Sequence, residues 1–238
     1  MSYSFGKSIV TDGLVFYVDA ANENSYPGSG TTWFDLIGEN DGTFEPVAGP
    51  TYDSANGGSI AFDGADDGVV LANNSVFYLT PNQDQTNCGW FSTDNTSTST
   101  IIYDARNVIG AVTKGYFIGV QNNGTLRAWF YYDLSSTLSL KLSTSISQNT
   151  WYYYSVVFNR TGLMSLYLNG TLEDSVDISP YTNNDYSINT NPNIGIKSYS
   201  GSGVLPFNGN ISNVSIYNRA LSSTEILQNY NALKNRFI

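Results

Sequence analysis

The chain contains 238 residues, and its 20 acidic against 10 basic side chains give a formal net charge of -10. This balance leaves no basic surface for a nucleic acid or an anionic membrane, and no stretch reaches the roughly 18 apolar residues of a membrane span. The sequence has no histidine, which removes the usual general base and the commonest metal ligand and argues against catalysis. Its single cysteine, Cys88, excludes an intramolecular disulfide and is expected to be buried.

The first part of the chain predicts a short arm, a strand and a long loop. Residues 1–8 form the arm, which lacks the basic segment and apolar run of a secretory signal, and residues 9–238 form one domain without an internal linker. Gly13 to Asp19 predicts a buried strand. In the turn-rich residues 20–49, the apolar Trp33 to Ile37 are expected to pack the loop against the domain.

A series of short β-runs occupies the middle of the chain. Turn residues such as Asn122, Asn123 and Gly124 separate them, at the spacing of roughly 8 to 12 residues that is typical of a sandwich or a barrel. The runs are Cys88 to Ser92, Thr100 to Asp104, Tyr116 to Gln121, Leu126 to Tyr132 and Leu138 to Leu142. The pattern therefore predicts an all-β fold.

The stretch from Trp151 to Gly170 predicts a hairpin that organises the core. Its first arm, up to Phe158, is apolar or aromatic on nearly every position of both faces, which favours a place between two packed layers. Asn169 and Gly170 suit the positive φ angles of a type I′ turn into the next strand. We expect this pair of strands to be the central hairpin of the fold.

The last element is predicted to be a short helix. Ser222 to Glu225 has the capping-box pattern, and an apolar stripe follows at helical spacing. The stripe consists of Ile226, Leu227, Tyr230 and Leu233. A single stripe of this kind most often packs on the sheet of its own domain, and docking on a partner chain is the alternative.

Two motifs resemble a known family. The Trp that opens the hairpin, together with the later Leu166-Tyr167-Leu168-Asn169-Gly170, resembles the central hairpin of laminin G-like domains, and residues 207–222 resemble that family's closing strand and helix cap. Residues 59–71 resemble its Phe-Asp-Gly strand pair. The resemblance implies an all-β concanavalin A-like jelly-roll sandwich of two antiparallel sheets with a short C-terminal helix. Ile9 to Gly38 is similar to the opening of laminin G-like virion proteins of tailed bacteriophages.

Acidic residues form two groups whose chemistry the sequence leaves open. Glu39, Asp41 and Glu45 are the candidates for a glycosidase pair. A solvated turn is favoured, because their spacing is not that of the related jelly-roll glucanases and Asn40-Asp41-Gly42 would break the strand that has to present them. Calcium has two candidate ligand sets, the first being Asp35, Asn40 and Asp41 and the second Asp63, Asp66 and Asp67. Relatives often carry an acidic pair where this chain has Ser212 and Asn213. We therefore assign no catalytic and no metal-binding residue, and calcium stays the alternative.

Glycan binding is the remaining candidate activity. A surface tyrosine such as Tyr181, Tyr186 or Tyr199 is suited to stack on a sugar ring, with Asn and Asp side chains bonding its hydroxyls. Tyrosine is also a common strand residue, so the 18 tyrosines make some exposure inevitable. The sequence singles out no ligand-binding position.

The favoured function is a non-enzymatic surface protein of a bacteriophage virion, assembled in the host cytoplasm. It is either a capsid decoration or head fibre, or a tail-associated module. Its partners are expected to be virion proteins or sister subunits, as a homo-oligomer or trimer, and host-surface glycan. Residues 1–7 of the arm are the expected attachment point. The alternatives are a free carbohydrate-binding module or lectin and, third, a jelly-roll glycosidase.

Overall fold

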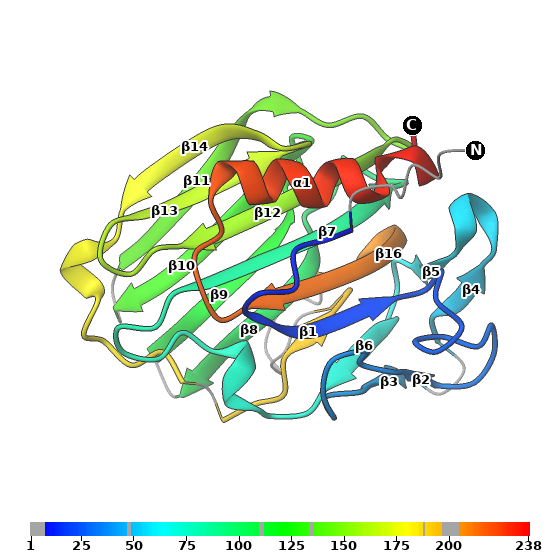
Figure 1. The fold of residues 1–238 in the computed structure, drawn as a ribbon, viewed down its shortest axis with the longest axis horizontal. Coiled ribbons are helices and arrows are strands. Elements are labelled where there is room, and N and C mark those ends of the chain that lie inside the picture. The colour runs from blue at the N-terminus through cyan, green and yellow to red at the C-terminus, as the bar shows by residue number, and fades with distance from the viewer. Residues whose placement is uncertain (1–7, 47–48, 110–111, 134–135, 188, 197–204) are drawn as a thin grey trace, which may run out of the picture.

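A computed structural model gives the fold and describes residues 8–46, 49–109, 112–133, 136–187, 189–196 and 205–238. The described chain forms two eight-stranded antiparallel sheets that pack face to face, with an α-helix lying across the outside of one of them (Figure 1). The expected jelly-roll sandwich with a short C-terminal helix is confirmed. No helix among these residues has the length and apolar character needed to cross a membrane.

Sheet A, the sheet that carries the helix, has β7 and β16 at its middle. Across the sheet its strands are β14 (Thr171–Asp177), β13 (Leu163–Leu168), β12 (Trp151–Phe158), β7 (Gln85–Thr93), β16 (Asn208–Tyr217), β5 (Ser59–Asp63) and β4 (Thr51–Asp53), and β1 (Leu14–Asp19) also pairs with β16. The β12–β13 hairpin forms as predicted, but its expected central place is wrong. Strand β14 pairs with its outer edge and β7 with its inner edge, so the hairpin lies to one side.

The turn between β13 and β14 has the expected conformation. Asn169 and Gly170 have φ angles of 51° and 82°, the positive values that a type I′ turn requires at both central positions. The Asn169 side chain also accepts a hydrogen bond from the Tyr153 backbone N–H at 2.9 Å, which ties the turn to the neighbouring strand.

Sheet B forms the second layer. Across the sheet its strands are β11 (Ser136–Ser145), β10 (Thr125–Asp133), β9 (Val112–Val120), β8 (Thr100–Ile109), β15 (Asn193–Ile194), β6 (Gly68–Leu71), β3 (Gly42–Glu45) and β2 (Thr32–Trp33). Four 3₁₀ turns connect elements of the described chain, namely η1 (Ala55–Gly57), η2 (Ser75–Phe77), η3 (Ser179–Tyr181) and η4 (Lys234–Arg236).

The main core lies between the two sheets. Phe158 of sheet A meets Tyr116 and Phe130 of sheet B, with ring centroids 4.7 and 5.8 Å apart, so side chains of the two layers interdigitate. A polar chain crosses the same core, because the Tyr154 hydroxyl donates to Asn87 and the Tyr116 hydroxyl donates to Gln85. These two buried hydroxyls are thus paired, and the bond from Tyr116 to Gln85 joins the two layers.

A second core forms between sheet A and the helix α1 (Ser223–Leu233). The capping box is present, since Ser222 and Glu225 each bond the other's backbone N–H. Trp90 of β7 stacks on Tyr230 and Phe237, with centroids 5.6 and 4.4 Å apart. The apolar stripe therefore packs on the domain's own sheet, as expected.

The long loop after β1 packs only in part. Trp33 is fully buried, but Phe34 and Ile37 are 41% and 48% exposed, so the expectation that this apolar run packs as a unit is wrong for its later residues. Strand alternation explains the split, because Trp33 ends β2 facing the core while the chain leaves the sheet after it. Cys88 is buried as expected, and burial raises the pKa of its thiol to about 11.

Candidate functional site

The outer face of sheet B carries aromatic and arginine side chains on three neighbouring strands. In β10, Leu126, Ala128 and Phe130 point into the core, so the alternate positions point outward. We call the outward group on these strands the aromatic–arginine face. Its members are Asp104 and Arg106 of β8, Phe117 of β9, and Arg127, Trp129 and Tyr131 of β10.

Strand register and two glycines bring these side chains together. Phe117 stands opposite Asp104 on one side and opposite Trp129 on the other. The outward positions before and after Phe117 on the same strand are Gly115 and Gly119, which have no side chain. Gly115 lies between Arg106 and Tyr131, and the arginine reaches across this gap. The sequence of β9 thus leaves room for the long side chains of the flanking strands.

The rings and guanidinium groups form a stacked layer. The Phe117 and Trp129 rings are nearly parallel, at 10°, with centroids 4.4 Å apart. The guanidinium carbon of Arg106 lies 3.8 Å from the Phe117 centroid, and that of Arg127 lies 5.3 Å from the Trp129 ring. Trp129 and Tyr131 are half-buried, whereas Phe117 is buried. The partly exposed members of the layer are two aromatic residues, Trp129 and Tyr131, and one arginine, Arg127.

The charges on this face differ in how they are compensated. Asp104 accepts two hydrogen bonds from the Arg106 side chain, at 2.7 and 2.6 Å, and both side chains are almost completely buried. This two-pronged pair neutralises Arg106 and fixes its plane against Phe117. Arg127 has no carboxylate in an ion pair with it among the described residues, and burial lowers its pKa.

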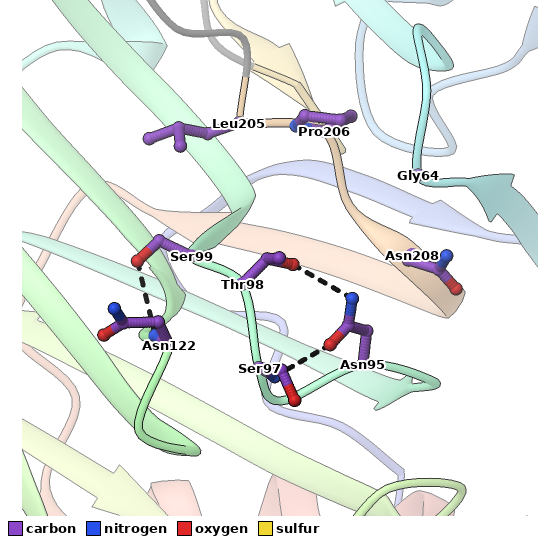
Figure 2. A pocket seen from close by; sticks show the side chains of 9 residues that line it. All are labelled: Gly64, Asn95, Ser97, Thr98, Ser99, Asn122, Leu205, Pro206 and Asn208. Carbon is purple, nitrogen blue, oxygen red and sulfur yellow. Dashed lines mark hydrogen bonds between the residues drawn. The ribbon is translucent and has the colours of Figure 1, made fainter.

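A polar pocket at the edge of the sandwich is a second candidate. Its volume is about 420 Å³, and Figure 2 shows that Asn95 bonds back to Ser97 and Thr98 within its own loop. No aromatic side chain lines the described pocket, and part of its polar capacity is already used internally. The lining residues are Gly64, Asn95, Ser97, Thr98, Ser99, Asn122, Leu205, Pro206 and Asn208. It suits a sugar less well than the aromatic–arginine face does.

The acidic residues Asp63, Asp66 and Asp67 come together beside this pocket. Their carboxylate oxygens lie within 4.8 Å of one another, which fits the oxygen chemistry of calcium. Two of the carboxylates also bind backbone groups of their own loop. Asp67 accepts a hydrogen bond from the Asp63 N–H, and Asp63 accepts one from the Ala65 N–H. Burial raises the pKa of Asp67.

The other acidic candidates are used by their own loop. Asp35 accepts hydrogen bonds from the backbone N–H groups of Tyr17, Ile37 and Gly38, and Asp41 accepts from the Asp35 N–H. These bonds hold the loop after β2 in shape. Glu39 and Asp41 are exposed outside any strand and only Glu45 lies in one, β3, so the described structure does not assemble the glycosidase arrangement.

The closing strand has a structural role at Ser212. Its hydroxyl donates to the Gly58 carbonyl at 2.8 Å and accepts from Arg236 at 2.7 Å. Arg236 also forms an ion pair with Asp19 of β1. Ser212 therefore takes part in joining the C-terminal end of the chain to sheet A. Asn213 beside it is buried.

The structure excludes one of the three tyrosines that were expected to be available for stacking on a sugar. Tyr186 is 2% exposed and packs edge-on against Phe130, so the expectation is wrong for this residue. Tyr181 is partly buried and stacks on Tyr132 with centroids 3.9 Å apart, and Tyr199 lies outside the described residues. Sequence reasoning missed Arg127 and Trp129. The alternation of Leu126 to Tyr132 was the signal, since it assigns both to the outward face.

The antiparallel β-sandwich of two packed sheets is the fold of a lectin-like class of protein, and the comparisons agree. The family model of the concanavalin A-like lectin/glucanases superfamily matches residues 63–227. The chain belongs to this superfamily. No curated protein sequence is detectably similar to it.

Several solved structures share the fold at low sequence identity. The binding domain of Paraclostridial Mosquitocidal Protein 1 has a TM-score of 0.73 and 17% identity, over 94% of this chain and 53% of that one. A structure of botulinum neurotoxin type C, whose cell entry is dependent upon interaction with two ganglioside molecules, has a TM-score of 0.69 and 17% identity, over 93% of this chain and 51% of that one. A mutant Trypanosoma rangeli sialidase has a TM-score of 0.69 and 16% identity, over 97% of this chain and 35% of that one. The chain spans about half the length of the toxin structures.

Proposed function

We propose that this chain is a glycan-binding domain and that the aromatic–arginine face of sheet B is its binding surface. The observation that carries the proposal is the Phe117–Trp129 stack with a guanidinium group over each ring. Sugar rings have apolar C–H faces that pack on aromatic rings, and their hydroxyls accept hydrogen bonds from arginine. Support also comes from the superfamily, which includes lectins, and from the binding domains with the same fold.

Binding is proposed in preference to catalysis. Glycoside hydrolysis uses two carboxyl groups about 5 to 10 Å apart that flank the scissile bond. The carboxylate described on this face, Asp104, is fully buried and held by Arg106, so it has no freedom to act as a nucleophile or a proton donor. The sequence also offers no histidine as a general base.

The place of action that we propose is the surface of a bacteriophage particle, with host-surface glycan as the ligand and virion proteins or sister subunits as further partners. Support comes from the resemblance of Ile9 to Gly38 to phage virion proteins. Mass spectrometry and cryo-electron microscopy of purified particles test it. Ordered density for this chain at a fixed site is expected, and absence of the chain from particles would leave a free lectin.

The binding surface is tested by one matched pair of variants. Trp129→Ala is expected to weaken binding to the best ligand on a glycan array about tenfold or more, because it removes the aromatic platform. Trp151→Ala is the control, since Trp151 is also partly buried but packs on Phe237 on the opposite side of the molecule. Calorimetry measures both. Equal affinity of the two variants would show that glycan does not bind at Trp129.

A further inference from the structure

Arg127 is the arginine of the aromatic–arginine face that no described carboxylate neutralises. Other described arginines have clear partners: Arg106, Arg219 and Arg236 pair with carboxylates, and Arg160 donates to the backbone carbonyls of residues 80, 181, 182 and 184. The Arg127 side chain makes neither an ion pair nor a hydrogen bond with any residue that the structure describes. Its guanidinium contacts only the Trp129 ring among the described aromatics.

Burial makes this lack of a partner costly. The Nε atom of Arg127 is buried without a hydrogen-bond acceptor, and desolvation lowers the pKa of the group. A buried donor that has lost its water without gaining a partner destabilises the protein, and a charged donor does so more strongly. An arginine in this position costs stability that an apolar residue in the same strand would not.

The charge of Arg127 contrasts with the composition of the chain. The sequence has 20 acidic against 10 basic side chains, yet no described carboxylate forms an ion pair with Arg127. A guanidinium group without a counter-charge is suited to bind an anion.

We propose that Arg127 binds the anionic group of an acidic glycan, a carboxylate or a sulfate, while the adjoining sugar ring lies on Trp129. This inference rests on the proposed glycan-binding function and names the class of ligand. The planar guanidinium is suited to donate two parallel hydrogen bonds to such a group, which supplies the missing counter-charge. Arg106 is already neutralised by Asp104, so discrimination between acidic and neutral sugars depends on Arg127.

The test compares charged and uncharged forms of the same sugars. The probes are the trimer of galacturonic acid, its fully methyl-esterified form, and a sulfated and an unsulfated galactose trimer, each titrated by calorimetry at low and at physiological salt. An acidic trimer is expected to bind at least tenfold more tightly than its neutral counterpart, with a preference that falls as salt rises. The carboxylate and sulfate arms identify which anion the site takes.

Three variants assign the effect to its residues. Arg127→Gln is expected to lower affinity for the acidic trimer about tenfold and to leave the neutral trimer within about twofold. Arg127→Lys retains the charge without the planar fork and is expected to recover only part of the loss. Lys234→Gln is the control, because it changes the net charge equally at the C-terminal cap of α1, away from sheet B.

The outcomes separate the two proposals. Equal binding of acidic and neutral trimers overturns the acidic-ligand proposal, and so does an unchanged preference for the acidic trimer in Arg127→Gln. In either case the glycan-binding proposal stands if Trp129→Ala still weakens glycan binding. Binding of no trimer overturns the acidic ligand for these anions, and a glycan array unaffected by Trp129→Ala overturns the binding function itself. Folding of each variant is checked by its circular dichroism spectrum and unfolding midpoint.

Discussion

The two outer faces of this sandwich carry the same kinds of side chain but differ in how far the described chain covers them. On sheet A, Trp90 is fully buried because α1 and the residues after it bring Tyr230 and Phe237 onto its ring (Figure 1). On sheet B, Trp129 stacks on Phe117 of the same sheet and stays half-buried. An aromatic residue on an outer strand position therefore becomes core where the chain returns to cover it, and a contact surface where the described chain does not.

The largest expected difference between the faces is in stability. Trp90→Ala is expected to lower the free energy of unfolding by about 3 to 5 kcal/mol, because it leaves a cavity under α1 that the surroundings fill only in part. Trp129→Ala is expected to cost about 0.5 to 1.5 kcal/mol, the size of one aromatic pair. Urea unfolding of both variants measures this. Similar losses would mean that the two faces are equally covered.

Breaking the buried ion pair on sheet B is expected to cause the next largest loss of stability. Asp104→Asn is expected to destabilise the protein by about 3 to 5 kcal/mol, because it leaves the buried Arg106 guanidinium without its counter-charge. Asp12→Asn provides the matched control on the sheet A side. Asp12 pairs with Arg219 but its side chain is 86% exposed, so its loss is expected to cost about 0 to 1 kcal/mol. Comparable costs for both variants would contradict the burial of the first pair.

Acid is expected to weaken the sheet A side through the helix cap. Hydrogen bonds from Arg219 and from the Ser222 backbone lower the pKa of Glu225 from 4.5 to about 2. The stabilisation from this carboxylate is therefore complete above about pH 4.5 and is lost as the pH falls toward 2.

Unfolding of the wild type and of Glu225→Gln at a series of pH values measures this contribution. The wild type is expected to be more stable at pH 7, with a difference that shrinks as the pH falls toward 2. A difference that does not change with pH would show that Glu225 is not the titrating group. Glycan affinity at pH 7 is expected to be the same for both, since Glu225 caps α1 on sheet A.

The smallest expected effect is that of calcium on ligand binding. The acidic cluster of Asp63, Asp66 and Asp67 is outside the aromatic–arginine face, and the carboxylate of that face is held by Arg106. Affinity for glycan is therefore expected to be the same in EDTA and in millimolar calcium. Calorimetry under both conditions measures it, with Asp66→Asn as a second variant. Loss of binding on metal removal would assign the site to the acidic cluster.

Sequence patterns predicted which strands and which helix form. They did not predict which strands lie next to one another in the sheets. The β12–β13 hairpin, the Asn169–Gly170 turn and the capped helix each depend on residues close together in sequence, and each was found. The order of strands in the sheet depends on long-range pairing, so the sequence did not reveal that β7 and β16 occupy the middle.

The binding surface was harder to predict because exposure depends on what covers a residue. Tyr186 and Trp129 are equally plausible as surface aromatics in sequence, yet Tyr186 is buried against Phe130 and the Arg160 guanidinium. Alternation along β10 places Arg127 and Trp129 outward, but it does not show that Gly115 and Gly119 leave the room they need. That room depends on the pairing of three strands.

The two ends of the described chain are fastened to the same side of the molecule. Ser8 and Val10 accept and donate hydrogen bonds with Gln228 and Asn229 of α1, and Arg236 pairs with Asp19 beside them on sheet A. A tether, an affinity tag or a fused protein attached after Ile238 therefore leaves from the helix side. Immobilised on a sensor chip through that residue, the domain would present sheet B toward the solution, ready to sample ligands.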